Sequence, residues 1–254
     1  MNQSEKAETF AALHQPGAPL ILYNIWDAGS ARVVAEAGAK AVATGSVSVA
    51  GAQGFPDGQA IPLDLLLTVA ERITASVDLP VTVDFEGAYA TEPEAVAANA
   101  GRLIGVGAVG CNFEDQVIGG EGLHDIAAQA ARIRAMREAA DAAGARFFIN
   151  ARTDLFLKEP DKSRHPALLS AAKERAAAFA EAGASGFFAP ALFDLDAIAD
   201  LVAATPLPVN IIALPGAPSH ADLAKAGVAR ISYGPVPYRV AMKDLAAHYA
   251  ADIG

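Results

Sequence analysis

The sequence predicts an α/β fold, namely a single (β/α)8 barrel of the TIM type with an extra helix at its N-terminal end. Short runs rich in β-branched and aromatic residues alternate with longer alanine-rich stretches of helical period along the whole chain. Eight such runs occur, and several of them follow the same Ala-Gly junction. Eight βα units with short turns pair their strands in parallel and close naturally into a barrel. We therefore expect residues 1–254 to form one barrel domain.

The eight predicted strands are separated by segments long enough to hold a helix. The strands are Leu20–Asn24, Ala41–Thr44, Val81–Asp84, Ala108–Phe113, Arg146–Asn150, Gly186–Ala189, Val209–Ile212 and Arg230–Tyr233. Met1–Leu13 lies ahead of the first strand and is the predicted extra helix. The turn-rich stretch Gly45–Pro62 follows the second strand, and we interpret it as a long βα loop within the domain.

Glycine and proline mark the points at which predicted helices end and the next strands begin. An Ala-Gly pair occurs directly before a strand in the segments Glu36–Ala39, Ala142–Ala145, Glu181–Ala184 and Lys225–Val228. A glycine there can adopt the left-handed conformation that ends many helices. Pro80 and Pro208 each begin a strand at a position that needs no N–H. An open doubly wound sheet is the alternative, but no Gly-x-Gly-x-x-Gly motif follows the first strand.

Composition and charge argue against several classes of protein. The chain has 19 Lys and Arg against 29 Asp and Glu, a formal charge of -10. This balance argues against a nucleic-acid groove or an anionic membrane surface, because both need clustered cations. Cys111 is the one cysteine, so no intramolecular disulfide can form. We recognise no signal peptide and no apolar run of about 18 residues, so we expect a cytoplasmic protein with a small-molecule partner, no nucleic acid and no membrane.

Acidic side chains gather at the predicted carboxyl ends of the third and fourth strands, the rim at which barrel enzymes carry their active sites. Asp84 and Glu86 follow the third strand, and Glu114 and Asp115 follow the fourth. Crowded carboxylates repel one another unless protons or a cation neutralise them, and hard oxygen ligands suit Mg2+ or Mn2+. We interpret Asp84, Glu86 and Glu114 as metal ligands. The alternative is that each acid caps the helix that follows it.

Residues able to bind an anion follow other strands at the same rim. Arg152 follows the fifth strand, where its guanidinium would either grip a carboxylate substrate or form a structural ion pair. Thr44, Gly45 and Ser46 end the second strand and offer hydroxyl and backbone N–H groups to an anionic oxygen. Trp26 follows the first strand and would form either an apolar wall over the ligand or a staple for its loop.

One histidine is a candidate for proton transfer. His124 lies in the loop after the fourth strand and could donate a proton, with a role at the start of the next helix as the alternative. The other histidines lie on segments predicted to be at the surface, and we assign no chemistry to them. They are His14, His165, His220 and His248.

Together these positions resemble the isocitrate lyase and phosphoenolpyruvate mutase superfamily over almost the whole chain. The resemblance runs from Asn24–Arg32 to Arg230–Arg239. The motifs that carry it are Gly54–Asp57, Val81–Tyr89, Asn112–Gln116 and Ala151–Asp154, together with Asn210 in the seventh strand. The resemblance implies a barrel enzyme that uses Mg2+ or Mn2+ to act on a small carboxylate.

The resemblance also implies roles for single residues. Asp84 and Glu86 match the acids that hold Mg2+ directly or through water, and Glu114 and Asp57 complete the acidic surroundings. Arg152, Glu114 and His124 are the expected catalytic residues. The residues assigned to the substrate are Trp26, Thr44, Gly45, Ser46, Asp57, Arg152, Asn210 and Arg239.

Departures from the superfamily's pattern bear on the reaction. The lyases carry a Lys-x-Cys-Gly-His gating loop whose cysteine is the catalytic acid or base, whereas Val117–Asp125 has no cysteine. The asparagine that the mutases place there is absent too. Cys111 lies in an apolar strand and is expected to be buried and inert. Pro190 stands where the lyases have a glutamate. Isocitrate and methylisocitrate cleavage are therefore expected to be weak.

The function that we expect is that of a lyase or decarboxylase acting on a small 2-oxo or 2-hydroxy carboxylate through an enolate held against the metal. One alternative is a protein that binds metal and oxo acid without turnover, and another is a phosphonopyruvate-type mutase or hydrolase. A Schiff-base aldolase is disfavoured, because Lys158 lies beyond the end of the fifth strand. The resemblance further implies a tetramer or a dimer of dimers, with an interface near Val236–Ala251.

Overall fold

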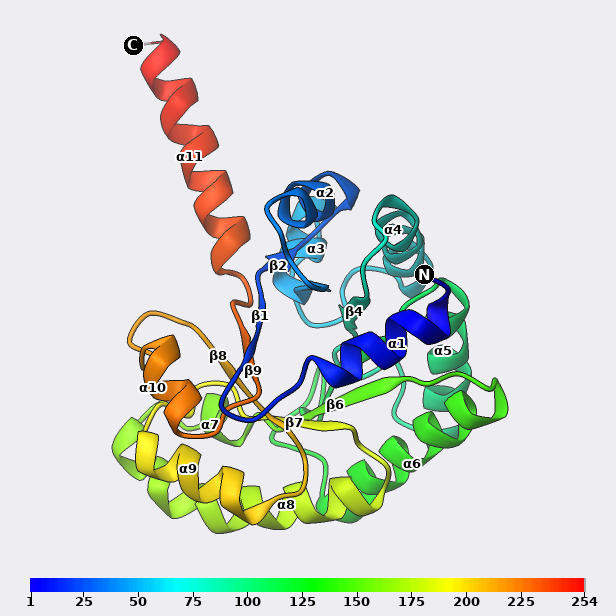
Figure 1. The fold of residues 1–254 in the computed structure, drawn as a ribbon, viewed down its shortest axis with the longest axis vertical. Helices are drawn as coiled ribbons and strands as arrows, with labels where there is room; N and C mark the ends of the chain where they lie inside the picture. Colours follow the sequence, from blue (N-terminus) through cyan, green and yellow to red (C-terminus); the bar gives the residue numbers. More distant parts are fainter. Residues whose placement is uncertain (254) are drawn as a thin grey trace.

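The computed structural model describes residues 1–253 and confirms the predicted α/β barrel of the TIM type (Figure 1). The strands are β1 (Leu20–Leu22), β2 (Asn24–Ile25), β3 (Val42–Thr44), β4 (Val81–Asp84), β5 (Gly110–Glu114), β6 (Phe148–Arg152), β7 (Gly186–Phe188), β8 (Val209–Ile212) and β9 (Arg230–Ser232). Neighbouring strands pair in parallel in the order β1-β9-β8-β7-β6-β5-β4-β3-β2. The first predicted strand is interrupted at Tyr23, so that β1 pairs with β9 and β2 pairs with β3. The two ends of the sheet thus meet in one chain segment, and the barrel is nearly closed.

Helices surround the sheet, and one of them precedes it as predicted (Figure 1). The helices are α1 (Gln3–Ala12), α2 (Ala28–Glu36), α3 (Ser46–Ala52), α4 (Leu63–Ser76), α5 (Pro93–Gly105), α6 (Ile126–Ala142), α7 (Leu155–Lys158), α8 (Leu169–Glu181), α9 (Leu195–Ala204), α10 (His220–Lys225) and α11 (Val236–Ile253), with a 3-10 helix at Lys162–Leu168. The region predicted as a long loop, Gly45–Pro62, contains α3. Its Ser-Val-Ser-Val-Ala-Gly-Ala sequence buries Val49 and Ala50 against the core.

Local sequence signals account for where many helices begin and end. Asp27 caps α2 by accepting a hydrogen bond from the Ser30 N–H (2.7 Å), and Asp125 caps α6 in the same way. Gly38 and Gly183 have φ values of 96° and 97°, the left-handed conformation predicted for the Ala-Gly junctions. The candidate metal ligands Asp84, Glu86 and Glu114 cap no helix, because α5 and α6 begin after Glu92 and Asp125. Capping therefore does not explain that acidic cluster.

The interior of the barrel changes from apolar to polar toward the carboxyl ends of the strands. At the amino ends, Phe10 of α1 packs with Leu22, Ala43 and Phe148 in a buried cluster. The next layer is polar, and its members are Thr82, Asn112, Asn150, Asn210 and Arg230. Arg230 is fully buried and donates to Asn112 Oδ1 (3.1 Å), which also accepts from Asn150 Nδ2 (2.8 Å). This polar layer forms the floor beneath the carboxyl ends of the strands, and Thr82 Oγ1 and Arg230 Nε and Nη1 have no hydrogen-bond partner in it among the described residues.

His14 is buried at the amino ends of the strands, contrary to the prediction that it lies at the surface. Its ring stacks on Phe148 (4.1 Å between centroids), and Nδ1 donates to the Phe10 carbonyl (2.8 Å). Burial, followed by the nearby charge of Arg230, lowers the pKa of His14 to about 3. His165 is also buried, next to Phe156. The surface prediction failed because the burial of His14 depends on Phe148, which is distant in sequence, and the burial of His165 depends on the packing of its 3-10 helix against α7.

The last helix, α11, extends away from the barrel (Figure 1). Its start contacts β2, while Leu245, Tyr249 and Ile253 farther along are more than 60% exposed. Within residues 1–253, no helix combines the length and the hydrophobicity needed to cross a bilayer.

The buried His14 predicts a specific loss of stability in acid. The unfolded chain binds a proton at His14 near pH 6.5, whereas the folded chain binds it only near pH 3. The contribution of neutral His14 to the free energy of unfolding is therefore fully present above pH 6.5 and is lost as the pH falls toward 3. Urea unfolding at several pH values should show that the wild type loses about 1.4 kcal/mol per pH unit more than His14→Phe below pH 6.5. The exposed control His248→Phe should follow the wild type, and equal slopes in all three proteins would refute the assignment.

Candidate active site

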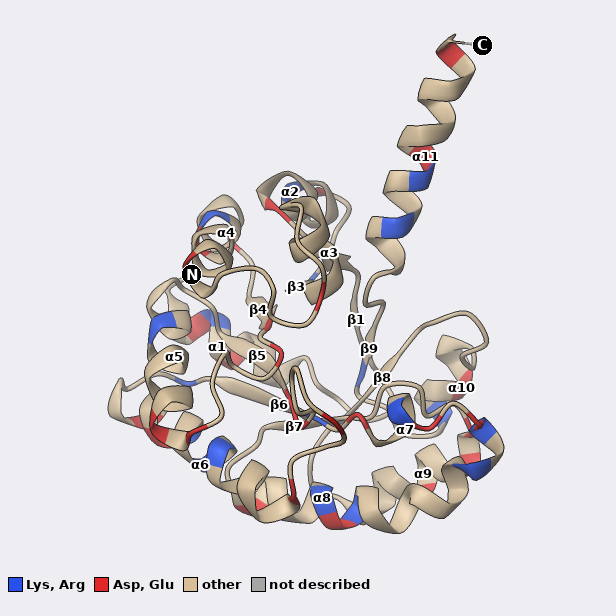
Figure 2. Cartoon of the chain, turned by 180° about the vertical axis from the view of Figure 1, so that it is seen from behind, with Lys and Arg blue, Asp and Glu red and all other residues tan. Residues whose placement is uncertain are grey.

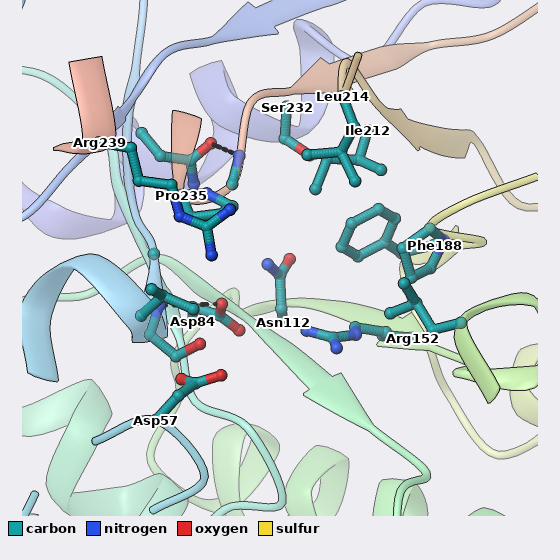
Figure 3. Close-up of a pocket in the computed structure, with 17 residues that line it drawn as sticks. Asp57, Asp84, Asn112, Arg152, Phe188, Ile212, Leu214, Ser232, Pro235 and Arg239 are labelled. Carbon is teal, nitrogen blue, oxygen red and sulfur yellow. Dashed lines mark hydrogen bonds between the residues drawn. The ribbon is translucent and has the colours of Figure 1, made fainter. Parts of the chain in front are cut away.

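A cavity of about 300 Å3 opens at the carboxyl ends of the strands and gathers several predicted residues (Figure 3). The predicted site residues that line it are Gly45, Ser46, Asp57, Asp84, Arg152 and Arg239. They come from the ends of β3, β4 and β6, from the loop after α3 and from the start of α11. Acidic segments lie at this centre of the molecule, while most Lys and Arg lie on the surrounding helices (Figure 2). The cavity is therefore the candidate active site.

Asp84 is fixed at the end of β4 with one carboxylate oxygen free of hydrogen bonds. Its backbone N–H donates to Thr44 Oγ1 (2.8 Å), and its Oδ2 accepts from the Ser46 N–H (3.1 Å). Asp84 Oδ1 is buried and has no partner among the described residues. A buried acceptor without a partner is costly, so this oxygen is suited to a ligand, a water molecule or a cation. Thr44 supports the position of Asp84 and does not line the cavity.

Arg152 is clamped between two carboxylates. Its Nη1 lies 2.9 Å from Glu114 Oε2, and its Nε and Nη2 donate to the two oxygens of Asp154 at 2.6 and 3.0 Å. Although burial opposes the charge, Glu114 and Asp154 raise the pKa of Arg152 above its usual value. The structural ion pair, one of the two alternatives for Arg152, is present. One N–H on each terminal nitrogen is still free to face the cavity.

Glu86 carries a buried carboxyl group that no cation neutralises among the described residues. Its Oε2 accepts a hydrogen bond from the Gln59 N–H (2.9 Å), and its backbone has a positive φ of 50°. Burial, followed by the charges of Asp84 and Asp57, raises the pKa of Glu86 to about 8. A nearby positive charge would stabilise the ionised form of this buried carboxyl group. The positive φ is a strained conformation for this residue type, and Arg132 holds the turn by donating to the Gly87 and Ala90 carbonyls.

The acidic residues fit a magnesium ion that is bound mainly through water. Within residues 1–253 no three His, Cys, Asp or Glu side chains converge into a ready set of ligands. Glu114 Oε2 lies against Arg152 and Glu86 Oε2 accepts from Gln59, whereas Asp84 Oδ1 is buried and has no partner among the described residues. Mg2+ in proteins usually keeps several waters and takes only one or two carboxylates, so Asp84 with Glu86 and Asp57 around it is a suitable set. The direct ligation predicted for Glu114 stays a prediction.

His124 does not line this cavity. It lies with Arg132 in a separate cavity, where burial, followed by the charge of Arg132, lowers its pKa. The loop before it forms a short hairpin through a bridge between Gln116 and Leu123. The His124 backbone is held on both sides, since its N–H donates to Asp115 and its carbonyl accepts from Arg175. A catalytic role for His124 would require this loop to move and stays a prediction.

Two other predicted substrate residues lie beside the cavity rather than in its wall. Trp26 packs edge-on against Tyr238 (5.2 Å between centroids), which agrees with the staple alternative. Asn210 is buried in the polar layer, where its Oδ1 accepts from Ser232 Oγ (3.3 Å) and its Nδ2 has no partner among the described residues. Any contact of either residue with a substrate stays a prediction.

Sequence reasoning gave no substrate role to several residues that line the cavity. Asn24 follows β1, and its Nδ2 donates to the Thr44 carbonyl while its Oδ1 accepts from the N–H groups of Tyr233 and Gly234. This side chain joins the segments on either side of the interrupted strand. The other lining residues that were missed are Val47, Asn112, Leu157, Phe188, Pro190, Ile212, Leu214, Ser232, Gly234 and Pro235. Asn112 could have been recognised from the sequence as a polar residue within an apolar strand. The apolar lining residues could not, because in sequence a residue of a cavity wall looks the same as a core residue.

Comparison with known proteins gives consistent results. A profile of the phosphoenolpyruvate phosphomutase family matches residues 10–253. The crystal structure of a protein from Burkholderia cenocepacia J2315, provisionally assigned as a phosphonomutase, is similar with a TM-score of 0.96 and 50% identity over 99% of this chain and 100% of that one. The 2-methylisocitrate lyase of Escherichia coli K12 is 31% identical over 78% of this chain and 70% of its own length. A phosphonopyruvate hydrolase crystallised with oxalate and Mg2+ shares the fold, with a TM-score of 0.84 and 20% identity over 99% of this chain and 87% of that one.

The ion pairs of Arg152 predict a large loss of stability when the cation is removed. Arg152→Met leaves Glu114 and Asp154 buried without a counter-charge, which should lower the free energy of unfolding by about 3 kcal/mol. Arg164→Met is the matched control, because Arg164 pairs with Glu159 at the surface and its removal should cost less than about 1 kcal/mol. Urea unfolding at pH 7 measures both. Similar losses in the two variants would contradict the buried clamp.

Proposed function

The chain belongs to the phosphoenolpyruvate mutase and isocitrate lyase superfamily, and from this premise we propose that it is a magnesium-dependent enzyme acting on a small 2-oxo or 2-hydroxy carboxylate. The observation that carries the proposal is the cavity that brings Asp84 Oδ1 together with two arginines, Arg152 and Arg239. Carboxylate oxygens favour a hard cation, and guanidinium groups favour an anionic ligand. A 2-oxo acid offers both an oxygen pair for a metal and a carboxylate for an arginine.

The residues of the chain have distinct roles in this proposal. Asp84 would hold Mg2+ directly, with Glu86 and Asp57 acting through water. When bound, Mg2+ would withdraw electron density from the oxo oxygen of the substrate and stabilise negative charge there. Arg152 and Arg239 would bind the anionic end, and the narrow cavity would orient the bond that breaks. In the decarboxylation of an oxaloacetate-like acid, the bond between C3 and its carboxylate breaks and CO2 leaves. The electron pair of that bond forms the C2–C3 double bond of an enolate with negative charge on the oxo oxygen, and C3 then takes a proton.

A lyase or decarboxylase is favoured over the other activities of the superfamily. The loop that supplies a cysteine in the isocitrate lyases has none here, and the backbone of His124 is tied to Asp115 and Arg175. Loss of carbon dioxide needs no loop group to take a proton from the substrate. A phosphonopyruvate-type mutase or hydrolase is the second candidate, because a provisionally assigned phosphonomutase is 50% identical over almost the whole chain. A protein that binds an oxo acid without turnover is the non-catalytic alternative.

Removal of the Asp84 carboxylate should abolish metal-dependent binding. Isothermal titration of oxalate with 5-fold excess of Mg2+ over protein should give an affinity at least about 100-fold weaker for Asp84→Ala than for the wild type, because even outer partners of a metal cost about 10-fold to 100-fold. Glu138→Ala, an exposed acid on α6, is the control and should bind as the wild type does. Circular dichroism should show that both variants keep their fold. Undiminished affinity in Asp84→Ala would refute the metal site.

Isocitrate and methylisocitrate should be poor substrates. The described loop Gln116–Leu123 brings only Glu121 as a titratable side chain, and this residue is exposed. Steady-state assays with Mg2+ should therefore show turnover far below the roughly 10 per second that is ordinary for an enzyme. A rate of that order for isocitrate would show that another group replaces the cysteine, and Glu121→Gln and His124→Asn would then identify it.

We also propose that the protein is a tetramer or a dimer of dimers in which α11 contacts a second copy. The apolar side chains Leu245, Tyr249 and Ile253 recur every four residues along α11 and are exposed. A groove outside β1 and α2 is lined by Ile21, Tyr23 and Val33, which are 40%, 42% and 66% exposed. Residues spaced by four lie on one face of a helix, so α11 offers an apolar stripe that suits such a groove.

If α11 forms the proposed interface, a single charged side chain introduced into its apolar stripe should weaken the association of the subunits. Multi-angle light scattering at micromolar concentration should give a mass above that of the 26.0 kDa chain for the wild type and a smaller mass for Leu245→Glu. Lys243→Glu is a matched control on the same helix and should keep the mass of the wild type, because it replaces an exposed polar residue. A wild-type monomer would refute the proposal.

A further inference from the structure

A second cavity of about 210 Å3, called the side cavity here, shares no lining residue with the candidate active site. Its walls come from the loop after α3, the turn after β4, the loop after β5 and helix α6. Its polar lining includes Gln59, Tyr89, His124 and Arg132. Among the described residues that line it there is no Asp or Glu. The side cavity therefore offers hydrogen-bond donors and a cation, but no carboxylate.

Arg132 brings to the side cavity a buried positive charge that has no ion pair among the described residues. The residue is 2% exposed. Its Nη1 donates to the Gln129 side chain and its Nη2 donates to the Gly87 carbonyl (2.8 Å), so these partners are uncharged oxygens. Its Nε is buried and has no partner among the described residues. Arg132 is thus held in place by neutral groups and keeps one unused donor.

The carboxylates whose charges act on Arg132 have ion pairs of their own. Glu114 pairs with Arg152, and Asp115 pairs with Arg175. Burial lowers the pKa of Arg132 to about 10, although the charges of Asp115 and Glu114 raise it. These acids therefore compensate the charge of Arg132 only in part. A buried cation of this kind would be stabilised by an anion beside it.

Two further donors that line the side cavity have no partner. Gln59 Nε2 and Tyr89 Oη are buried and make no hydrogen bond to the described residues. A Cβ atom added to Gly87 would lie 2.7 Å from Gln59 Nε2 and 3.6 Å from Arg132 Nη2, so the missing side chain of Gly87 leaves a space that both groups approach. His124 can add one N–H. Because buried donors without partners are costly, this space suits a ligand that accepts several hydrogen bonds.

From this geometry we propose that the side cavity binds a small tetrahedral oxyanion of the phosphate or sulfate class through Arg132, Gln59 and Tyr89. Such an anion presents acceptor oxygens in several directions at once, which suits donors on separate walls, and arginine binds it well. The cavity is far larger than the roughly 10–15 Å3 that one water needs. Water could satisfy the hydrogen bonds of the cavity, but it would not neutralise Arg132.

The bound oxyanion would also connect segments that shape the candidate active site. The loop that carries Gln59 carries Asp57, and the turn that carries Tyr89 carries Glu86. The Gln59 N–H already donates to Glu86 Oε2 (2.9 Å). An anion held by Gln59, Tyr89 and Arg132 would thus join this loop and this turn to α6. The inference does not depend on the function proposed above.

Isothermal titration with inorganic phosphate and with sulfate, at neutral pH and without Mg2+, tests the site. We expect saturable binding to the wild type with a dissociation constant of about 1 mM or lower. Sodium chloride at the same ionic strength should give no saturable heat, since a single halide cannot reach donors on separate walls. No saturable binding of phosphate or sulfate to the wild type would overturn the proposal and leave water as the occupant.

Variants of the two uncharged donors connect the binding to the side cavity. Gln59→Leu removes Nε2 but keeps the backbone N–H that donates to Glu86, and it should weaken phosphate binding at least about 10-fold, because hydrogen bonds to charged groups are strong. Gln53→Leu, at an exposed glutamine that ends α3, is the matched control and should bind as the wild type does. Equal affinities in Gln59→Leu and Gln53→Leu would overturn the proposal.

Tyr89→Phe separates ligand binding from a structural role. The Tyr89 hydroxyl has no partner among the described residues, so its removal should not lower the free energy of unfolding measured without phosphate. The affinity for phosphate should nevertheless fall at least about 10-fold. An unchanged phosphate affinity in Tyr89→Phe would contradict the proposed contact.

Arg239→Met distinguishes the side cavity from the candidate active site. Arg239 lines the candidate active site and not the side cavity, so its replacement should leave the phosphate affinity unchanged. If the affinity is instead lost in Arg239→Met, phosphate binds in the candidate active site and the inference is overturned. None of these results decides the proposed function, because the oxalate titration with Mg2+ tests that function separately.

Discussion

The neutralisation of buried negative charge at the carboxyl ends of the strands is the constraint on which the site depends. Glu114 and Asp115 end β5 and are almost inaccessible to solvent, so each needs a counter-charge. Arg152 supplies it to Glu114, and Arg175 of α8 supplies it to Asp115 (3.0 Å). Arg152 also pairs with Asp154, whereas Asp57, Asp84 and Glu86 form no ion pair among the described residues. This pairing determines which acids of the cavity can bind a cation.

Much of the fold was predictable because each βα unit carries its own local signals. Apolar runs, Ala-Gly junctions and prolines mark the strands and the ends of several helices from neighbouring residues alone, as Gly38 shows. The features that were missed depend on distant contacts. The burial of His14 arises from Phe148, far along the chain. The first strand is interrupted at Tyr23 because its two halves pair with different neighbours, β9 and β3, where the barrel closes. The sequence of that short segment does not indicate the interruption.

The candidate site was predictable to the level of residue type and strand end, but not to the level of side-chain direction. Asp84, Ser46, Arg152 and Arg239 line the cavity, as their positions at strand ends suggested. Thr44 instead accepts a hydrogen bond from the backbone N–H of Asp84, and Glu114 forms an ion pair with Arg152. Such contacts with neighbouring residues use the same atoms that a ligand would need. Phe188 and Ile212 resemble ordinary core residues in sequence, and only the barrel places them together opposite the acids.

The side chain of Asn24 closes the sheet where the first strand is interrupted. Where the first strand is interrupted, the ladder of backbone hydrogen bonds is broken, and the N–H groups of Tyr233 and Gly234 would otherwise form a short open edge. Open edges of sheets recruit strands from other molecules, and closed barrels avoid this hazard because they have none. By accepting from both N–H groups and donating to the Thr44 carbonyl, Asn24 completes the seam. A single buried amide thus pairs three backbone groups at the point where the sheet closes, in addition to lining the cavity above it.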